Sequence, residues 1–192
     1  QCAAEISTTT AITPLKAQSM VSEAIDRWVW YAGWSDKLSA VTGATNPVAG
    51  PYYNFTIPEP LGVVVVTASD SFIDFIDAIA AAVVSGNSVI ALVDGGLSVP
   101  AMTFAEVLAT SDLPAGVINI LTGSLDELAP WAASHMDVDG FDISAIGKKK
   151  RAELKVAGAE NLKRIYFADG KLTPSRILAF MEQKTVWHTI GV

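Results

Sequence analysis

The chain has 192 residues, with 13 Lys and Arg against 20 Asp and Glu, which gives a formal net charge of −7. Hydrophobic residues make up 51% and charged residues 17%, so the composition excludes a disordered chain and favours extensive burial, including burial under a partner. The acidic balance argues against a nucleic-acid-binding surface, and no apolar run approaches the roughly 18–20 residues of a membrane span.

The charge is divided unevenly along the chain. Residues 1–147 contain 3 basic and 16 acidic residues, whereas residues 148–192 contain 10 basic and 4 acidic ones. We expect the basic segment to pack on the acidic body of its own or a second chain. The alternative interpretation is that residues 148–151, the run Lys-Lys-Lys-Arg, bind an anion such as phosphate or RNA.

Cysteine content and the first residue bear on cellular context. The single cysteine, Cys2, permits neither an internal disulfide nor a zinc site, so we expect a cytoplasmic protein. We also expect Cys2 to lie in a mobile terminus. Because the sequence begins at Gln1 without a signal-like stretch, it is expected to be a segment of a longer polypeptide.

Residues 13–44 are predicted to form one long packing helix. Pro14 suits its first turn, and apolar residues recur at helical spacings. They are Val21, Ala24, Ile25, Trp28, Val29, Ala32 and Leu38. Because Trp30, Tyr31 and Trp34 also crowd onto it, more than one face is apolar, which favours a helix laid between the body and another surface.

Two segments far apart in the sequence are predicted to form isolated strands. The first lies in residues 45–60, where Pro58 and Pro60 remove ladder donors and therefore favour an edge position. The second lies in residues 182–192, after residues 171–181, which are expected to be a helix that leads to it. Since neither strand has another evident partner, we expect the two to pair as a projection at the edge of the body.

Residues 61–170 alternate between strands and helices. The apolar run at residues 62–66 is typical of a strand that helices cover on both faces. Further strands are predicted at residues 88–93, 117–121, 140–143 and 162–167, with helices beginning near residues 71, 100, 124 and 148. The series predicts an α/β fold, a three-layer doubly wound parallel sheet with right-handed crossovers.

A sheet of this kind binds ligands beyond the carboxyl ends of its strands, but the loops there offer little chemistry. They contain neither Gly-x-Gly-x-x-Gly nor Gly-x-x-x-x-Gly-Lys-Ser/Thr. His135 is predicted to end a helix and His188 to lie on a surface or interface strand. Asp137, Asp139 and Asp142 are predicted to be solvated loop acids, with a metal site as the alternative.

Several motifs occur in the order of a known family. They are Tyr-Ala-Gly-Trp-Ser-Asp-Lys (31–37), Glu-Pro-Leu-Gly-Val-Val (59–64), Ser-Gly-Asn (85–87), Leu-Pro-Ala-Gly-Val-Ile-Asn-Ile-Leu-Thr-Gly (113–123), Ser-His-Met-Asp-Val-Asp (134–139) and Asn-Leu-Lys-Arg (161–164). Over residues 23–165 the chain resembles the coenzyme-domain half of the aldehyde dehydrogenase superfamily. Residues 180–187 resemble that family's last strand, which lies in an oligomerisation flap. The resemblance implies a Rossmann-like body with a small β flap.

The departures from the family's pattern fall on its cofactor and oxyanion positions. Its oxyanion-donating Asn falls at Ser69, its ribose-binding Lys and Glu fall at Leu92 and Gly95, and its pyrophosphate turn runs over Ile146. The resemblance therefore implies no intact cofactor site, and NAD binds only if a residual site survives. The remaining anion candidates are Lys148, Lys149 and Lys150.

The family's catalytic groups are also replaced or missing. Its general base falls near Ala168, and where its catalytic domain with the nucleophilic Cys would follow, the sequence passes to the last strand. Without a thiolate this chain is not expected to oxidise an aldehyde alone. It resembles the non-catalytic second unit of the two-unit branch of the superfamily.

Three functions remain open on this reasoning. The first is a non-catalytic pseudoenzyme scaffold that binds a catalytic aldehyde dehydrogenase unit, either covalently linked or in a homo-oligomer, most simply a homodimer. The second is a fragment of an NAD-dependent aldehyde dehydrogenase, and the third is a nucleotide or anion sensor. We expect no catalytic residue, metal, nucleic acid or membrane partner.

Overall fold

The computed structural model describes residues 1–191; the last residue of the predicted segment 182–192, Val192, lies outside the described residues. In chain order the elements are α1 (Cys2–Thr10), α2 (Pro14–Ala32), α3 (Leu38–Thr42), β1 (Ala44–Asn46), β2 (Tyr52–Pro60), β3 (Val63–Ala68), α4 (Phe72–Val84), β4 (Ser88–Val93), η1 (Gly95–Leu97), α5 (Ser98–Ala109), β5 (Ile118–Thr122), α6 (Leu125–Ser134), β6 (Gly140–Asp142), α7 (Lys148–Ala159), β7 (Arg164–Tyr166), α8 (Ser175–Ala179) and β8 (Met181–Thr189).

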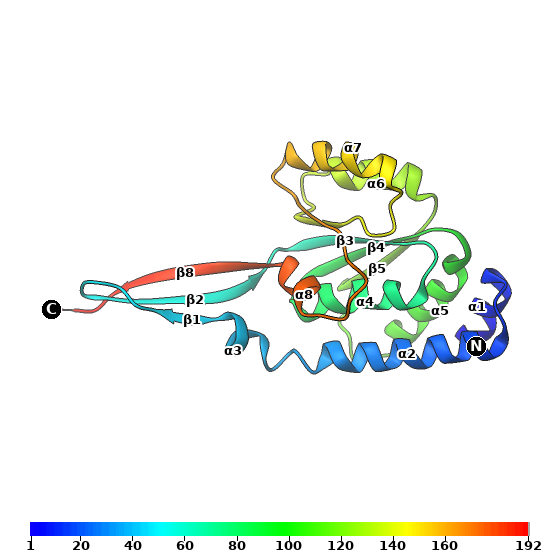
Figure 1. The fold of residues 1–192 in the computed structure, drawn as a ribbon, viewed down its shortest axis with the longest axis horizontal. Helices are drawn as coiled ribbons and strands as arrows, with labels where there is room; N and C mark the ends of the chain where they lie inside the picture. The colour runs from blue at the N-terminus through cyan, green and yellow to red at the C-terminus, as the bar shows by residue number, and fades with distance from the viewer. Residues whose placement is uncertain (192) are drawn as a thin grey trace.

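The body is built around a five-stranded sheet in the order β5-β4-β3-β6-β7, and every neighbouring pair in it is parallel. Figure 1 shows α6 and α7 on one face of this sheet and α1, α2, α4 and α5 on the other. The predicted three-layer α/β architecture is therefore confirmed.

The central strand β3 explains why the body folds this way. Its valines alternate between two apolar clusters: Val64 and Val66 pack toward α4, whereas Val65 packs toward Phe141 and the helices α6 and α7. A strand that is buried on both faces has an unbroken run of apolar residues in its sequence. Asp70 and Ser71 are both suitable caps for the α4 helix, and the structure has Ser71 in this role: its Oγ accepts the Asp74 N–H at 3.1 Å.

A second, three-stranded sheet forms a flap that extends away from the body (Figure 1). β2 pairs antiparallel with β8 from Tyr52 opposite Thr189 to Pro60 opposite Met181, so the predicted pairing of the two distant strands is confirmed. The predicted edge position of the first strand is wrong, because β2 lies between β1 and β8. β1 reaches only as far as Thr56, so Pro58 and Pro60 still have no strand beside them on that side.

Residues 13–44 do not form one helix, which corrects the sequence prediction. α2 ends at Ala32, and side chains complete its last turn: Ser35 Oγ donates to the Ala32 carbonyl at 2.8 Å, and Lys37 Nζ donates to the Gly33 carbonyl. The backbone bonds also change here: the Trp34 N–H donates to the Tyr31 carbonyl at 2.9 Å and the Ser35 N–H to the Ala32 carbonyl at 3.1 Å, which are i→i+3 turns and not the i→i+4 bonds of a continued helix. The chain then turns into α3 and β1.

Residues 171–181 are also helical over only a short part, in α8. Met181 already pairs with Pro60 of β2, and Arg164 donates to its carbonyl, so the flap strand begins where the helix was expected to end. At the N-terminus, the segment around Cys2 that is expected to be mobile instead forms the helix α1, whose fully buried Ile6 anchors it to the body.

The basic C-terminal segment packs on the acidic body of the same chain, as its charge predicts. Three ion pairs join the two parts: Lys150 with Asp126 at 2.8 Å, Arg176 with Asp142 at 2.6 Å, and Lys184 with Glu59. Within the part of the chain that the structure describes, no helix is long and apolar enough to cross a membrane.

Candidate functional site

The carboxyl ends of the parallel strands are where a ligand crevice is expected in this fold. After β3, Ser69 Oγ donates to Asp70 Oδ2 at 2.8 Å, and Ser71 caps α4. The resemblance places the family's oxyanion-donating carboxamide at Ser69. The Ser69 hydroxyl is already engaged by the neighbouring carboxylate.

The end of β4 contains an acid, Asp94, beside the two positions at which the resemblance places the family's ribose-binding groups. Asp94 Oδ1 accepts the Gly95 N–H at 2.6 Å, and Asp94 Oδ2 accepts the N–H of Leu125, the first residue of α6, at 2.9 Å. The carboxylate thereby occupies the α6 N-terminus, where an anionic ligand would otherwise find free N–H donors. Leu92 is buried and apolar, and Gly95 has no side chain.

A buried polar cluster lies at the end of β6. Asp142 Oδ2 accepts from Arg176 Nε at 2.9 Å and from Arg176 Nη2 at 2.6 Å. Its other oxygen accepts the Ser144 N–H at 2.9 Å and the Ser144 hydroxyl, and Ser144 Oγ in turn accepts the Ala168 N–H at 2.8 Å. Ala168, near which the resemblance places the family's general base, is therefore held by a backbone hydrogen bond, and its side chain is a methyl group.

Burial and charge act in opposite directions on Arg176. Burial lowers the pKa of its guanidinium, but the Asp142 carboxylate outweighs this effect and leaves the pKa above its ordinary value. The guanidinium therefore keeps its charge, and both side chains are almost completely inaccessible to solvent. It holds α8 against the sheet.

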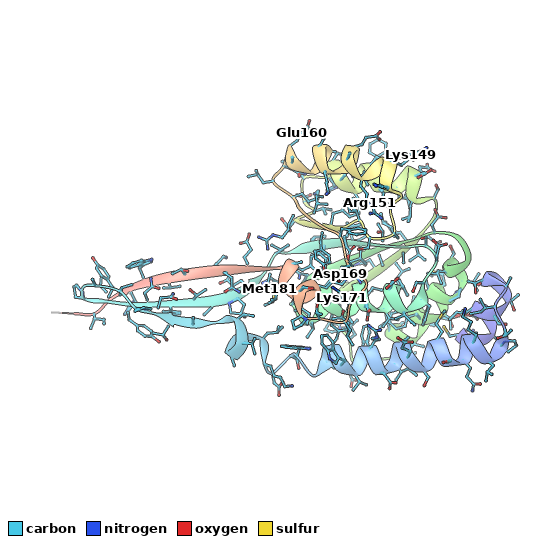
Figure 2. The ribbon with its side chains drawn as sticks, in the orientation of Figure 1. Lys149, Arg151, Glu160, Asp169, Lys171 and Met181 are labelled. Atoms are coloured by element: carbon cyan, nitrogen blue, oxygen red, sulfur yellow. The ribbon has the colours of Figure 1, made fainter. Side chains whose placement is uncertain are left out.

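The α7 N-terminus holds the predicted anion candidates. Lys148 and Lys149 are exposed, and Lys150 is paired with Asp126. Arg151 instead turns inward: its Nε donates to the Ile146 carbonyl at 2.7 Å, and its guanidinium lies 3.9 Å from the ring centroid of Phe167. Figure 2 shows Arg151 between α7 and the sheet and Lys149 toward the outer surface.

These residues do not fit a nicotinamide dinucleotide. Leu92 and Gly95, where the resemblance places the family's ribose-binding groups, present no polar side chain. Ile146, in the pyrophosphate turn, is buried and apolar, and the nearest guanidinium is committed to a backbone carbonyl. The carboxylate of Asp94 would repel a phosphate at the adjacent helix terminus.

The other candidate side chains form local hydrogen bonds or ion pairs, or lie at the surface. His135 ends α6, as predicted, and its Nδ1 accepts the Asp137 N–H at 3.2 Å; His188 is exposed on β8. Asp139 Oδ2 accepts the Val63 N–H at 2.8 Å. Of the predicted loop acids, Asp142 is not solvated but fully buried, because Arg176 pairs with it. No group of three metal-ligating side chains occurs among residues 1–191.

Cys2 is not placed as a nucleophile. Burial raises the pKa of its thiol to about 11, and the nearby charge of Glu5 adds to the increase. The thiol therefore stays protonated at neutral pH, and the thiolate is the reactive form.

Sequence reasoning missed Arg176 and Asp94. Arg176 belongs to a short helix far along the chain from its partner Asp142, and nothing in the local pattern links them. Asp94 had a usable signal, since an acid directly after a buried strand and before Gly95-Gly96 is a common turn and capping residue.

Comparison with known proteins identifies the family. The model of the aldehyde dehydrogenase family matches residues 1–183. The chain belongs to the aldehyde dehydrogenase family. Human (Homo sapiens) retinal dehydrogenase 2 is 32% identical over 152 residues, which are 78% of this chain and 29% of that protein. Cytosolic aldehyde dehydrogenase 1 of Rattus norvegicus is 30% identical over 152 residues, 78% of this chain and 30% of that protein.

Solved structures of the family share the fold. Betaine aldehyde dehydrogenase from Staphylococcus aureus, solved in complex with NAD+, superposes with a TM-score of 0.76 at 19% identity, over 85% of this chain and 32% of that one. This chain thus spans about three tenths of the length of the curated relatives named above. It is a partial representative of the aldehyde dehydrogenase fold.

Proposed function

We propose that this chain is the coenzyme-domain part of an NAD-dependent aldehyde dehydrogenase, in which it supplies architecture while residues elsewhere bind the cofactor and react. The observation that carries the proposal is the occupied carboxyl edge of the sheet. Asp94 fills the α6 terminus, and the Asp142–Arg176 pair fills the end of β6. The names of the relatives support an oxidoreductase parent, and the name of the rat relative supports a cytoplasmic one.

Calorimetry and an activity assay on the purified chain test this proposal. We expect no saturable heat with NAD or NADP up to about 1 mM, a limit that corresponds to roughly 4 kcal/mol of binding free energy. We expect no NADH formation from aliphatic or aromatic aldehydes, with a complete member of the family as the positive control. Turnover by the chain alone, or micromolar NAD binding, would contradict the proposal.

A second candidate function is a non-catalytic scaffold for a catalytic unit, as in the two-unit branch that the sequence resembles. Its specific support is the short connection from β7 to the flap strand β8, which leaves only residues 167–180 where the family inserts its catalytic domain. The partner would be a linked catalytic unit or a second copy in a homodimer, bound through the flap. Light scattering of the chain, alone and mixed with a catalytic family member, separates this role from a purely internal one.

The anion-sensor function has weaker support. Of the four basic residues at 148–151, Lys150 pairs with Asp126 and Arg151 with the backbone of its own chain. Titration with phosphate and ATP, compared with a Lys148→Ala/Lys149→Ala variant, tests it. Equal, negligible heats for the two proteins would remove it.

A further inference from the structure

The segments at the ends of β4 and β6 lie where this fold presents its ligand-binding groups, and here they contribute to the apolar core. Leu92, near the end of β4, is 3% exposed, and Ile146, in the loop after β6, is 4% exposed. Both belong to the cluster that the sheet forms with α6 and α7, together with fully buried Phe141 and Ile143. The edge where a crevice is expected therefore supplies core side chains.

The backbone donors of the loop after β6 are engaged within the chain. Folds of this kind hold phosphates with free N–H groups of such loops and of helix N-termini. Here the Ser144 N–H donates to Asp142 Oδ1 at 2.9 Å. The Ala145 N–H donates to Thr67 Oγ1 at 3.2 Å, and the Ile146 N–H donates to the carbonyl three residues before it at 3.1 Å. Three consecutive donors are thus not free for a phosphate.

Two charged side chains connect these segments to the helices that cover them. Asp94 accepts the N–H of Leu125, the first residue of α6, at 2.9 Å, and Leu125 belongs to the same apolar cluster. Arg151 of α7 donates through Nε to the Ile146 carbonyl at 2.7 Å, and Figure 2 shows it between α7 and the sheet. Gly95 has a φ of 64°, a left-handed conformation in which a Glu side chain is strained. The contacts that occupy this edge therefore also hold α6 and α7 on the core.

We propose that the edge at which this family would hold its dinucleotide is a structural part of the core in this chain, so that polar side chains at Leu92 and Ile146 destabilise the fold and do not restore NAD binding. This inference rests on the proposed function, in which the chain supplies architecture, and adds a physical reason for it. A crevice that lacked only polar side chains would have free loop N–H groups and solvent-exposed apolar replacements.

Thermal denaturation of two matched charge variants tests the structural role. Leu92→Lys places a charge in the buried cluster. Leu121→Lys places the same charge on β5, at the position paired with Leu92, where the side chain is 50% exposed. We expect Leu92→Lys to lower the Tm of the full chain by about 10 °C or more, and Leu121→Lys by less than about 3 °C. Equal Tm values for the two variants would overturn the proposal.

A milder pair of variants decides the question if Leu92→Lys does not fold. Ile146→Ser replaces a buried apolar side chain by a hydroxyl, whereas Ile146→Val keeps it apolar. We expect Ile146→Ser to lower the Tm by about 8 °C and Ile146→Val by about 3 °C. If Ile146→Ser melts like the parent chain, this side chain does not support the core and the proposal is wrong.

Calorimetric titration with NAD tests the binding half of the proposal. The triple variant Leu92→Lys/Gly95→Glu/Ile146→Ser restores the two ribose-binding groups that the resemblance places there and a polar side chain in the pyrophosphate turn. We expect no saturable heat up to about 1 mM NAD, with a complete member of the family as the positive control. If circular dichroism shows the triple variant to be unfolded, Ile146→Ser takes its place in the titration.

The outcomes separate this proposal from the proposed function. NAD binding by the parent chain would contradict both. Saturable binding by a polar variant alone would overturn the structural role of this edge, since the site would then lack only polar groups, and would leave the proposed function standing. Loss of Tm without any gain of NAD binding is the expected result.

Discussion

In the body, Phe141 and Ile79 are fully buried on opposite sides of the parallel sheet, whereas in the flap β8 is exposed from Glu182 onward. The body gains its stability from apolar surface removed from water. The flap has a nine-residue ladder between β2 and β8, with cross-strand contacts such as that of Tyr52 with Trp187, whose ring centroids lie 5.9 Å apart. Such pairs contribute only about 0.2–1 kcal/mol each.

The difference shows that the two regions are stabilised in different ways. The body is stabilised by its own apolar core. A three-stranded sheet that projects from the body, with most of its side chains in water, is stable only while its ladder stays attached to the body. The attachment is made at Met181 and α8, where Arg164 donates to the Met181 carbonyl and Arg176 reaches Asp142.

The largest expected effect comes from truncating one aromatic residue in each region. Phe141→Ala should lower the free energy of unfolding by about 4 kcal/mol, because it leaves a cavity in the core. Trp187→Ala should cost less than about 1 kcal/mol, since this side chain is 61% exposed. Urea denaturation followed by circular dichroism measures both.

The same two variants can also contradict the contrast between a buried body and an exposed flap. If Trp187→Ala costs as much as Phe141→Ala, the flap is buried in solution, and the free chain is assembled through it. A dependence of the Trp187→Ala effect on protein concentration would identify that assembly.

A smaller effect is expected at the link between body and flap. Arg176→Met leaves the Asp142 carboxylate buried without its counter-charge, so we expect a loss of about 3 kcal/mol. The double variant Arg176→Met/Asp142→Leu removes that stranded charge and should recover part of the loss. Denaturation in urea at pH 7 compares them. A single variant that unfolds like the parent chain would show that the pair does not hold α8 in place.

Much of the fold could be predicted because its signals are local. The valine run of β3 and the Ser71 cap of α4 lie within a few residues of what they determine. α1 was missed because Thr8, Thr9 and Thr10 are poor helix formers; their hydroxyls donate to carbonyls one turn earlier in this helix. The break after Ala32 is a change from i→i+4 to i→i+3 backbone bonds, which the periodicity of apolar residues does not reveal.

In the candidate site, the sequence predicted mainly which polar side chains are absent. Leu92 and Gly95 show from their identity alone that two polar groups are absent. What replaces them could not be predicted, because Asp142 and Arg176 meet only after the chain has passed through α7, β7 and a loop. Likewise, the apolar hollow between α2, α4 and α5 arises from three helices, and the pattern of α2 alone indicates only that it has several apolar faces.

The smallest expected effect tests whether the interior of the body tolerates a charged carboxylate. Asp77 of α4 is buried, and its Oδ1 has no hydrogen-bond partner among the described residues. Burial raises the pKa of its carboxyl, and Arg27 and Arg176 oppose this only in part. The folded state therefore binds this proton more tightly than the unfolded state does. Its stabilising contribution is present below the unfolded pKa and is lost as the pH rises through the raised, folded value.

Asp77→Asn should remove this loss, since the amide stays neutral while its oxygen can still accept from Arg27, which lies 3.2 Å from the native carboxylate. Unfolding free energies measured across pH 4 to 7 should then fall less for the variant than for the parent chain, with the largest difference at the upper end. Asp26→Asn, which removes a carboxylate at an exposed position on α2, is the matched control. If Asp77→Asn lowers stability at pH 7, the ion pair with Arg27 outweighs the burial of the charge, and the body tolerates a buried carboxylate at Asp77 as it does at Asp142.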